Sequence, residues 1–465
     1  MNSPAAATAE PSQTLYAKRR KIYVRSVDGF FVKWRWALVW ITQALFYGLC
    51  WLPWNGRQAV LFDLVQRKFY IFGLVFWPQD VFYLAVLLII SAYALFLFTA
   101  IGGRLFCGYA CPQTVYTEIF MWIEEKIEGE RNARMKLDRA PTDARKIGIK
   151  AAKHLAWIAV ALWTGFTLAG YFTPIREQVH EFAEWRLGGW QTFWIFFYAF
   201  FTYLMAGFMR EQVCKYMCPY ARFQGVMFDP DTLIVTYDES RGEPRGARTK
   251  SGDNAGKGDC IDCGLCVQVC PTGIDIRNGL QYECIGCSAC IDACDNVMDK
   301  TGLPRGLVRY STENAMAKKW GKAEIMGHLV RPRIMVYTGV LVAISIATAL
   351  GIAMRLPLKV DVIRDRGVMA REVEDGLIEN VFTLRFMNTD ERPRVFRVGI
   401  AGLDGIRLAG AAEVEVAPAS TKSVVVPVRV PPEAGKQGSH PIVFDVAATD
   451  DAAVRLKEKA VFIMP

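Results

Sequence analysis

The sequence from Cys260 to Cys294 reads CIDCGLCVQVCPTGIDIRNGLQYECIGCSACIDAC. It contains two consecutive runs of four cysteines with the spacing C-x2-C-x2-C-x3-C, and Pro271 follows the first run. This is the pattern of bacterial ferredoxins with two clusters, in which the fourth cysteine of each run ligates the other cluster. Gly264, Gly273 and Gly286 free the backbone where it wraps closely. The predicted ligands are Cys260, Cys263, Cys266 and Cys294 for one [4Fe–4S] cluster, and Cys284, Cys287, Cys290 and Cys270 for the other.

Two other uses of cysteine compete with this interpretation. Structural zinc sites commonly take four ligands in two spaced pairs, and eight cysteines in two tandem quartets fit that arrangement poorly. Disulfides persist in oxidising compartments, whereas the charge pattern described below places this segment in the cytoplasm. Two iron–sulfur clusters therefore remain the prediction.

The composition indicates a chain that is part membrane protein and part soluble protein. Of its 465 residues, 52% are hydrophobic, with 13 Trp and 28 Phe, which is too apolar for an ordinary soluble protein. The formal net charge of +9 does not indicate nucleic-acid binding, because most basic residues lie beside apolar stretches and report membrane topology. No cleavable signal peptide is expected, because no apolar core with a small-residue cleavage site follows the charged N-terminus.

Five apolar stretches predict membrane-spanning helices. Residues 81–100 run for 20 residues without a charged side chain, which is about 30 Å of helix and matches the hydrocarbon core of a bilayer. The lengths and flanking aromatic residues of the stretches favour membrane spans over buried helices of a globular domain. The five stretches are residues 36–52, 81–100, 155–172, 193–208 and 334–354.

The distribution of lysine and arginine predicts the orientation of these spans. Residues 1–35 contain seven and residues 104–153 contain ten, against three in residues 55–79 and two in residues 174–189. Basic segments stay in the cytoplasm, so the N-terminus and the 104–153 segment are expected there. Five spans then place the cluster-binding segment in the cytoplasm and the C-terminus on the other side.

From residue 356 onward the pattern changes to short alternating runs separated by turn residues. Runs of this length and spacing predict an antiparallel β-sandwich of immunoglobulin-like type. The runs are Leu358–Ile363, Asn380–Met387, Val395–Ile400, Glu413–Val416, Ser423–Val430 and Ile442–Ala447.

The sequence as a whole predicts a multi-domain membrane protein. Its expected parts are an α-helical transmembrane bundle of five spans, a dicluster ferredoxin-like α+β segment and a C-terminal immunoglobulin-like β-sandwich. The expected boundaries are 1–33 for a basic cytoplasmic N-terminus, 34–238 for four transmembrane helices, 239–258 for a flexible linker, 259–333 for the ferredoxin domain, 334–354 for the fifth helix and 355–465 for a periplasmic immunoglobulin-like domain.

Four further cysteines form two copies of a second motif, C-x3-C-P. The sequence CGYACP (residues 107–112) follows the second apolar stretch, and CKYMCP (residues 214–219) follows the fourth. On a helix, cysteines at i and i+4 share one face with their Cβ atoms about 5–6 Å apart, and the following proline perturbs the helix. Both stretches run inward in the predicted topology, so we expect all four thiols at the same depth, near the cytoplasmic face.

Three interpretations of Cys107, Cys111, Cys214 and Cys218 stay open. Buried structural cysteines leave the duplicated spacing and the prolines unexplained. Dithiol–disulfide chemistry occurs transiently in reducing compartments. Sulfur ligands suit Cu(I), zinc or an iron–sulfur cluster, so a soft-metal site is favoured. Cys50 stands alone in the first stretch and is interpreted as a packing residue.

The remaining side chains do not indicate another cofactor. His154 and His328 flank predicted spans but form no paired pattern, so no haem site is expected. No glycine-rich loop follows a predicted strand, so no flavin or nicotinamide site is expected.

The combination of five spans, two C-x3-C-P motifs, a two-cluster segment and a β-domain resembles the CcoG/FixG/RdxA family, which are accessory proteins for assembly of cbb3-type cytochrome c oxidase. The stretches IRDR (residues 363–366) and IENVFTL (residues 378–384) also look like that family's C-terminal domain. Asp295 stands where the first cluster motif has Pro271, and we expect this departure to change potential or packing without loss of a cluster.

The resemblance implies a role in copper supply, namely reduction of Cu(II) to Cu(I) before its insertion into the oxidase. It assigns copper binding and reduction to Cys107, Cys111, Cys214 and Cys218, the counterparts of the family's membrane motifs. The implied location is the bacterial inner membrane. The implied partners are the lipid bilayer, a cytoplasmic electron donor, a copper chaperone or transporter, subunits of the oxidase and a second copy of the chain, without nucleic acid.

Two alternative functions stay open beside copper reduction. Polyferredoxins of the nitrate- and nitrous-oxide-reductase systems carry similar C-x3-C-P motifs, which suggests a quinol-linked membrane electron conduit. A redox-sensing scaffold, in which the β-domain tethers oxidase subunits, is the alternative from a different class of function.

Overall fold

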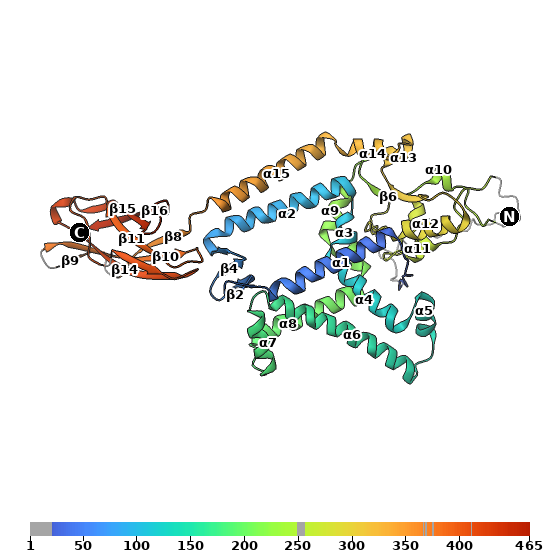
Figure 1. Cartoon of the computed structure of the whole chain (residues 1–465), viewed down its shortest axis with the longest axis horizontal. Coiled ribbons are helices and arrows are strands. Elements are labelled where there is room, and N and C mark those ends of the chain that lie inside the picture. Colours follow the sequence, from blue (N-terminus) through green and yellow to red (C-terminus); the bar gives the residue numbers. More distant parts are fainter. Residues whose placement is uncertain (1–20, 249–255, 366, 368–369, 374–375, 411) are drawn as a thin grey trace, which may run out of the picture. The chain divides into compact units, whose positions relative to one another are not determined.

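The computed structural model describes residues 21–248, 256–365, 367, 370–373, 376–410 and 412–465 (Figure 1). These residues form two compact units, each assembled from separated segments of the chain. Unit 1 contains the described residues up to Trp40 together with Phe98–Ala161 and Phe201–Arg331. Unit 2 contains Ile41–Leu97, Leu162–Phe200 and Pro332–Pro465.

Three helices of the described chain are long and apolar enough to cross a membrane. Most of their apolar side chains are exposed, as expected where lipid covers a helix. They agree with the predicted spans 81–100, 193–208 and 334–354. The three are Pro78–Gly102, which contains α2 (Val81–Gly102), Gly189–Met209, which contains α8 (Gly189–Thr202), and α15 (Pro332–Ala353).

The other two predicted spans also form helices, but they are not among these three. α1 covers Phe30–Gly48 and carries Lys33 and Arg35 in its first turns. α6 covers Ala144–Ala169 and carries four basic side chains before residue 154. Charged side chains in the first turns shorten the continuous apolar segment of each of these two helices. The prediction of five spans is therefore confirmed for three helices.

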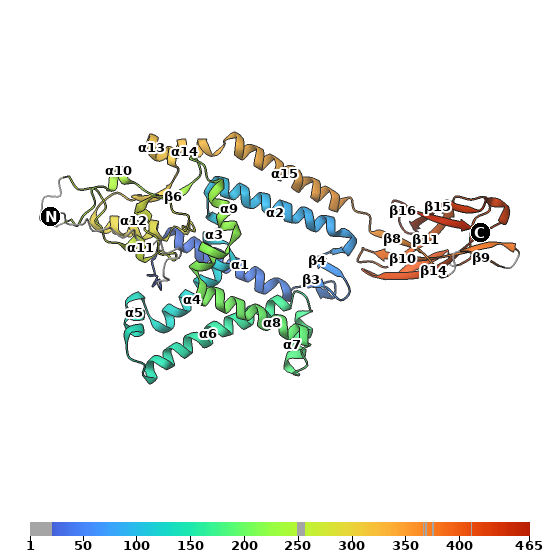
Figure 2. The same cartoon turned by 180° about the vertical axis from the view of Figure 1, so that it is seen from behind.

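The ferredoxin-like segment contains few regular elements and lies within unit 1 (Figure 2). Its two strands, β6 and β7, pair antiparallel, so the folded segment begins before residue 259. Its elements are β6 (Ile234–Tyr237), α10 (Glu239–Gly242), α11 (Leu265–Gln268), α12 (Ala289–Thr301), β7 (Val308–Ser311), α13 (Glu313–Lys318) and α14 (Lys322–Leu329). The rest of unit 1 contains α3 (Leu105–Tyr109), α4 (Pro112–Glu128), α5 (Arg131–Arg139) and α9 (Pro219–Met227).

The predicted flexible linker 239–258 falls partly on residues 249–255, which lie outside the described residues. Its described part is attached to the ferredoxin segment. Arg241 forms an ion pair with Asp259 at 2.5 Å, and the Gly246 N–H donates to the Cys260 carbonyl at 2.9 Å.

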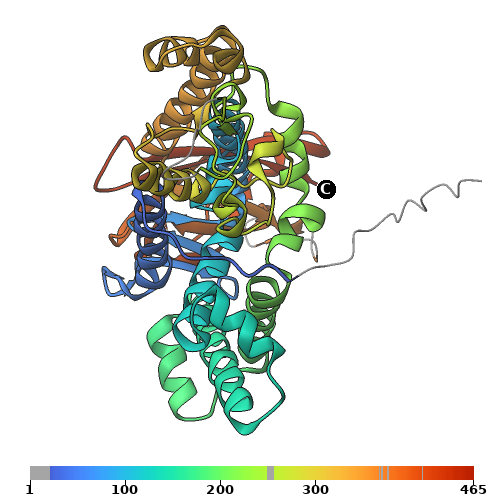
Figure 3. The same ribbon diagram turned by 90° about the vertical axis from the view of Figure 1, so that its right-hand side faces the viewer.

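The segment 21–29, here called the N-terminal strap, leads into α1 and lies against the ferredoxin segment (dark blue in Figure 3). The Arg25 N–H donates to the Gln268 carbonyl at 2.9 Å. The carboxylate of Asp292, in α12, accepts the N–H groups of Phe31 and Val32 at 3.2 and 2.8 Å. Because a helix leaves its first N–H groups without partners, Asp292 caps α1 from a distant part of the chain.

The C-terminal part of unit 2 is a sandwich of two antiparallel sheets (Figure 1). One sheet has the order β12-β14-β10-β8, with β9 beside β10, and the other has the order β13-β11-β15-β16. Alternating residues from both sheets form one apolar core, which includes the fully buried Phe382, Phe396 and Phe444. The strands are β8 (Leu358–Arg364), β9 (Arg371–Glu372), β10 (Ile378–Asn388), β11 (Arg394–Ala401), β12 (Arg407–Leu408), β13 (Glu413–Val416), β14 (Thr421–Val430), β15 (Gly438–Ala448) and β16 (Arg455–Met464).

A small sheet from the segment between α1 and α2 packs against this sandwich within unit 2. Tyr70, Val75 and Trp77 form an apolar cluster with Met387 of β10. This small sheet contains β3 (Val60–Asp63), β4 (Lys68–Ile71) and β5 (Leu74–Phe76), and a separate two-stranded sheet contains β1 (Pro53–Trp54) and β2 (Arg57–Gln58). α7 (Ile175–Ala183) lies elsewhere in the same unit.

A buried carboxylate at the start of α2 joins α2 to the sandwich. Asp80 forms ion pairs with Arg355 at 2.9 Å and with Lys359, and accepts the Trp77 N–H at 3.0 Å. The Asp80 side chain is 5% exposed. Buried charges need such partners, so Asp80 holds the segments before β8 and before α2 together.

Candidate functional site: two cysteine cavities beside four further thiols

One cavity of the ferredoxin segment is lined by Cys260, Cys263, Cys266 and Cys294. Cys266 comes from α11 and Cys294 from α12, and these two short helices pack against each other. Cys263 is exposed at the surface, whereas Cys260 is buried. The fourth cysteine of the second run therefore joins the first three of the first run, the combination that the spacing predicts.

A second cavity is lined by Cys270, Cys284, Cys287 and Cys290, and Cys266 lines both cavities. Burial raises the pKa of the Cys284 thiol to about 12, and it raises the pKa of Cys290 well above its ordinary value. Buried thiols with raised pKa values become thiolates only when a positively charged group binds them. Four sulfur donors around a cavity fit an iron–sulfur cluster better than a hard cation.

Three glycines around the two cavities have positive φ angles, the freedom of the backbone that was expected of them. Gly264, Gly273 and Gly286 have φ values of +64°, +71° and +68°. The Gly286 N–H donates to the Cys284 sulfur at 3.4 Å. Asp295, which replaces a proline, accepts the Gly306 N–H at 2.9 Å and so fixes the end of the segment.

The first C-x3-C-P motif is not one continuous helix. Cys107 lies in α3, but Cys111 is extended, with φ −63° and ψ 127°, and caps the N-terminus of α4. The expectation that both cysteines share one helical face is therefore wrong here. Pro112 causes the break, because a residue before proline is disfavoured from the helical conformation.

The second motif repeats this arrangement. Cys214 lies in a short π-helix, Val213–Met217, and Cys218 is extended, with φ −79° and ψ 111°. Pro219 is the first residue of α9, so Cys218 also caps a helix. The second cysteine of each motif thus lies at the N-terminus of a helix.

The four C-x3-C-P thiols lie in one neighbourhood. Burial, with the nearby sulfurs of Cys111 and Cys214, raises the pKa of Cys107 to about 12. Burial, with Cys111 and Cys218, raises the pKa of Cys214 to about 11. The effect of one thiol on the pKa of another weakens with distance. Because thiols of each motif affect the pKa of Cys107 or Cys214, the two motifs lie close together. In the part of the chain that the structure describes, no three His, Cys, Asp or Glu side chains converge tightly enough to hold a single metal ion.

The C-x3-C-P group directly adjoins the second cavity. Cys107 and Cys214 pack against the apolar cluster that contains Ile285 and Cys287. A Cβ atom on Gly108 would lie only 2.8 Å from the Gly286 oxygen and 2.9 Å from the Cys287 nitrogen. Real Cβ atoms essentially never approach other atoms so closely, so Gly108 permits backbone contact between α3 and the loop of the second cavity.

Family comparisons cover most of these segments. The model of a 4Fe-4S dicluster domain matches residues 209–313, which include the second C-x3-C-P motif and all eight ferredoxin cysteines. The model of a 4Fe-4S binding domain matches residues 84–129, which include the first C-x3-C-P motif. The model of the IG-like fold at the C-terminal of FixG matches residues 348–465, and its description names FixG as a candidate oxidoreductase.

Whole-chain comparison decides the family. The chain is 39% identical to the nitrogen fixation protein FixG of Rhizobium meliloti over 433 residues, which cover 86% of this chain and 83% of that protein. The chain belongs to the FixG/RdxA family. Another member, the protein RdxA of Cereibacter sphaeroides, is 36% identical over 457 residues, which cover 96% of this chain and 95% of RdxA.

A crystal structure of a FixG-related protein from Vibrio parahaemolyticus is 20% identical and covers 23% of this chain and 95% of its own, with a TM-score of 0.21. Family membership makes this chain an iron–sulfur electron-transfer protein of the FixG type.

Two residues of this FixG-family site were not singled out from the sequence. Gln224 of α9 is fully buried and accepts a hydrogen bond from the Cys107 thiol at 3.2 Å, which joins the two motifs. Arg104, three residues before Cys107, is 6% exposed. The only feature of the sequence that could have pointed to Gln224 and Arg104 is their position, because each lies within one or two helical turns of a motif cysteine. Cys50 is buried, and its thiol donates to the Tyr47 carbonyl at 3.5 Å, in agreement with a packing role.

Proposed function

We propose that this FixG-family protein is a cupric reductase of the bacterial inner membrane, which reduces Cu(II) to Cu(I) for assembly of a cbb3-type cytochrome c oxidase. The observation that carries the proposal is the group of four C-x3-C-P thiols beside the second cysteine cavity. Sulfur ligands favour Cu(I), the softer ion, so these thiols stabilise the product of the one-electron reduction.

The ligands that we propose for the two clusters are the two cavity linings. Cys260, Cys263, Cys266 and Cys294 would hold one [4Fe–4S] cluster. Cys270, Cys284, Cys287 and Cys290 would hold the other. When bound, such clusters supply electrons one at a time, which is the stoichiometry that Cu(II) requires.

The division of the chain into two units supports the five-span topology. The chain passes from one unit to the other after residues 40, 97, 161, 200 and 331. Four of these positions lie inside α1, α2, α6 and α8, and the fifth lies just before α15. Among the segments that join the first four predicted spans, the basic segment 104–153 belongs to unit 1, and the segments 55–79 and 174–189, with few basic residues, belong to unit 2. We therefore propose a cytoplasmic N-terminus and iron–sulfur segment, and a periplasmic β-sandwich.

Replacing Cys214 and Cys218 by serine tests copper reduction directly. With both cluster EPR signals retained, the purified double variant should reduce Cu(II) much more slowly than the natural protein, as measured with a Cu(I)-specific chelator. Cys50→Ala is the matched control, because Cys50 is a buried thiol of the other unit. An unchanged rate in the double variant would place copper reduction elsewhere.

A third [4Fe–4S] cluster is the alternative occupant of the C-x3-C-P thiols. Iron–sulfur family models match the two segments that contain these motifs. Iron and acid-labile sulfide analysis after anaerobic purification separates the two occupants. About eight iron atoms per chain leave these thiols to copper, whereas about twelve assign them to a cluster.

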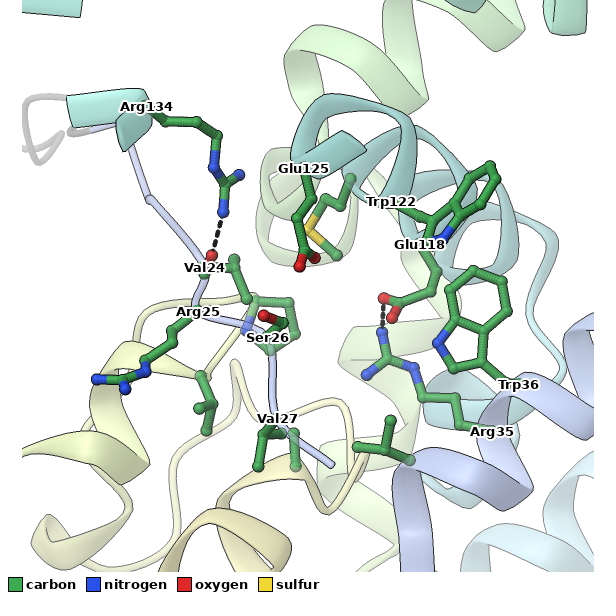
Figure 4. A pocket seen from close by; sticks show the side chains of 15 residues that line it. Val24, Arg25, Ser26, Val27, Arg35, Trp36, Glu118, Trp122, Glu125 and Arg134 are labelled. Carbon is green, nitrogen blue, oxygen red and sulfur yellow. Dashed lines mark hydrogen bonds and ion pairs between the residues drawn. The ribbon is translucent and has the colours of Figure 1, made fainter. Parts of the chain in front are cut away.

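A second candidate function, quinol oxidation, is favoured by a cavity next to the second cysteine group. This cavity lies between the N-terminal strap, α1, α4 and the loop at Pro271, and is lined by Trp36 and Trp122 (Figure 4). Arg35 and Glu118 form a buried ion pair at its wall. Arg25, Glu125 and Arg134 also line the cavity. Aromatic walls with polar groups suit a ring with polar oxygens. Reduction of the clusters by a short-chain quinol, lost in Trp36→Ala, would favour this function over a soluble donor.

The periplasmic partners that we propose for the β-sandwich are the copper acceptor and subunits of the oxidase. Deletion of residues 356–465 tests whether the β-sandwich binds partners while the rest of the chain reduces copper. Copper reduction should persist while oxidase assembly fails. Loss of copper reduction as well would show that the sandwich is needed for the chemistry.

A further inference from the structure

Arg104 is a buried cation at the junction of the two groups of cysteines. It precedes α3, and only 6% of its surface is exposed. Its backbone lies against Gly286, where an added Cβ atom would be 3.2 Å from the Arg104 carbonyl. Its guanidinium donates from Nη2 to the Ala221 carbonyl of α9. Arg104 therefore contacts the loop of the second cavity and the helix that follows the second C-x3-C-P motif.

The guanidinium lacks a carboxylate partner among the described residues. No Asp or Glu oxygen of the described chain lies within 4.0 Å of it, and its Nε has no hydrogen-bond partner. Glu211 acts on Cys214 but forms no ion pair with Arg104 in the structure. A buried charge without a counter-ion is strongly unfavourable, and native proteins almost always provide a partner.

Arg104 lies beside residues of both cysteine groups. It stands three residues before Cys107, its guanidinium bonds the Ala221 carbonyl three residues after Cys218, and its backbone lies against Gly286, between Cys284 and Cys287. Neutral thiols do not balance a positive charge, whereas metal-bound thiolates carry net negative charge. Such thiolates on each side of Arg104 would supply the missing counter-charge.

We propose that Arg104 is the shared counter-cation of the four C-x3-C-P thiols and of the iron–sulfur cysteines of the second cavity. An added electron makes a cluster more negative, so a nearby buried cation favours the reduced form and raises the reduction potential. The same cation favours thiolates that bind a soft metal ion. Arg104 is a positioning residue, because it acts through the cysteines and contacts neither copper nor iron itself.

Arg277 provides a matched comparison at the other cavity. Its guanidinium is part of the lining with Cys266, and it is paired with Asp275 at 2.7 Å and with Asp262 at 2.5 Å. Two carboxylates already balance Arg277, so its effect on the first cluster should be smaller than the effect of Arg104 on the second.

The test is an EPR-monitored redox titration of the full-length protein, purified anaerobically with its clusters, in Arg104→Gln, Arg104→Lys and Arg277→Gln. Cys263→Ser, at the exposed cysteine of the first cavity, assigns the two signals. We expect Arg104→Gln to lower the potential of the second cluster by at least a tenfold change in its reduction equilibrium, about 59 mV, and to leave the first unchanged. Arg104→Lys should restore most of the shift, because it keeps the charge.

Three results decide the matter. Equal shifts of both signals, or no shift, in Arg104→Gln with unchanged iron content overturn the proposal. If Arg104→Gln loses iron but Arg104→Lys keeps its full iron content, the positive charge is what the site requires, and the proposal is supported. Iron loss in both variants overturns the proposal. The titration needs no copper, so it rests only on the iron–sulfur part of the proposed function and fails independently of copper reduction.

Discussion

Adding a single methyl group at Gly108 should separate the C-x3-C-P thiols from the second cavity. The Cβ of Gly108→Ala would lie 2.8 and 2.9 Å from backbone atoms of Gly286 and Cys287, which cannot rotate away as a side chain can. Overpacking of this kind costs about 1–3 kcal/mol. Replacing glycine by alanine inside a helix would otherwise gain about 1 kcal/mol, so the steric loss must exceed that gain. We expect a net destabilisation of up to about 2 kcal/mol.

Gly148→Ala is the matched control for this experiment, because Gly148 also lies in a helix and nothing lies within 4 Å of its added Cβ. The assay is the urea concentration at which iron–sulfur absorbance is lost in detergent, measured beside the rate of Cu(II) reduction. Gly108→Ala should lower both values, and Gly148→Ala should leave both unchanged or slightly raised. If the two variants behave alike, α3 and the Gly286 loop do not touch in the working protein, and the proposed adjacency is wrong.

Two further outcomes are expected. Asp80→Asn should destabilise unit 2 by about 3–5 kcal/mol, because it leaves Arg355 and Lys359 without their buried counter-charge. Thermal unfolding followed by near-UV circular dichroism measures this loss of stability. A melting temperature equal to that of the natural protein would contradict the prediction. Cu(I) binding to the C-x3-C-P group should strengthen between about pH 6 and about pH 8 by about tenfold per pH unit for each proton released. The sign follows from Cys107 and Cys214, whose raised pKa values keep the free thiols protonated over this range. A chelator competition that gives a pH-independent affinity would show that the bound thiols are already ionised.

The cysteine spacing predicts the local site well because it is set by short-range geometry. Three cysteines separated by two residues each must surround one point, and the fourth reaches the neighbouring cavity through a short helix. The two cavities accordingly contain the two expected sets of four cysteines, and Cys266 lines both cavities. The glycines were predictable for the same reason, since a tight loop requires positive φ at Gly264, Gly273 and Gly286.

Features that depend on distant partners could not be predicted in this way. Cys111 and Cys218 are extended because each precedes a proline, which disfavours the helical conformation. The prediction that the cysteines at i and i+4 share one helical face did not take this effect of proline into account. β16 begins with alternating charged residues from Arg455, which conceals the strand until its apolar end. Nothing local marks Arg104 as a shared neighbour of two cysteine groups, because Gly286 and Ala221 reach it only through tertiary packing.

The cap that Asp292 provides to α1 has a consequence for biogenesis. Ribosomes make α1 some 260 residues before Asp292, so the first helix leaves the exit tunnel with its N-terminal N–H groups open. Asp292 lies between Cys290 and Cys294, within the helix that carries ligands of both proposed clusters. The helix that carries these cysteines therefore also completes the start of the first helix, and the N-terminal turn of α1 gains this cap only after α12 has been made and has packed against it.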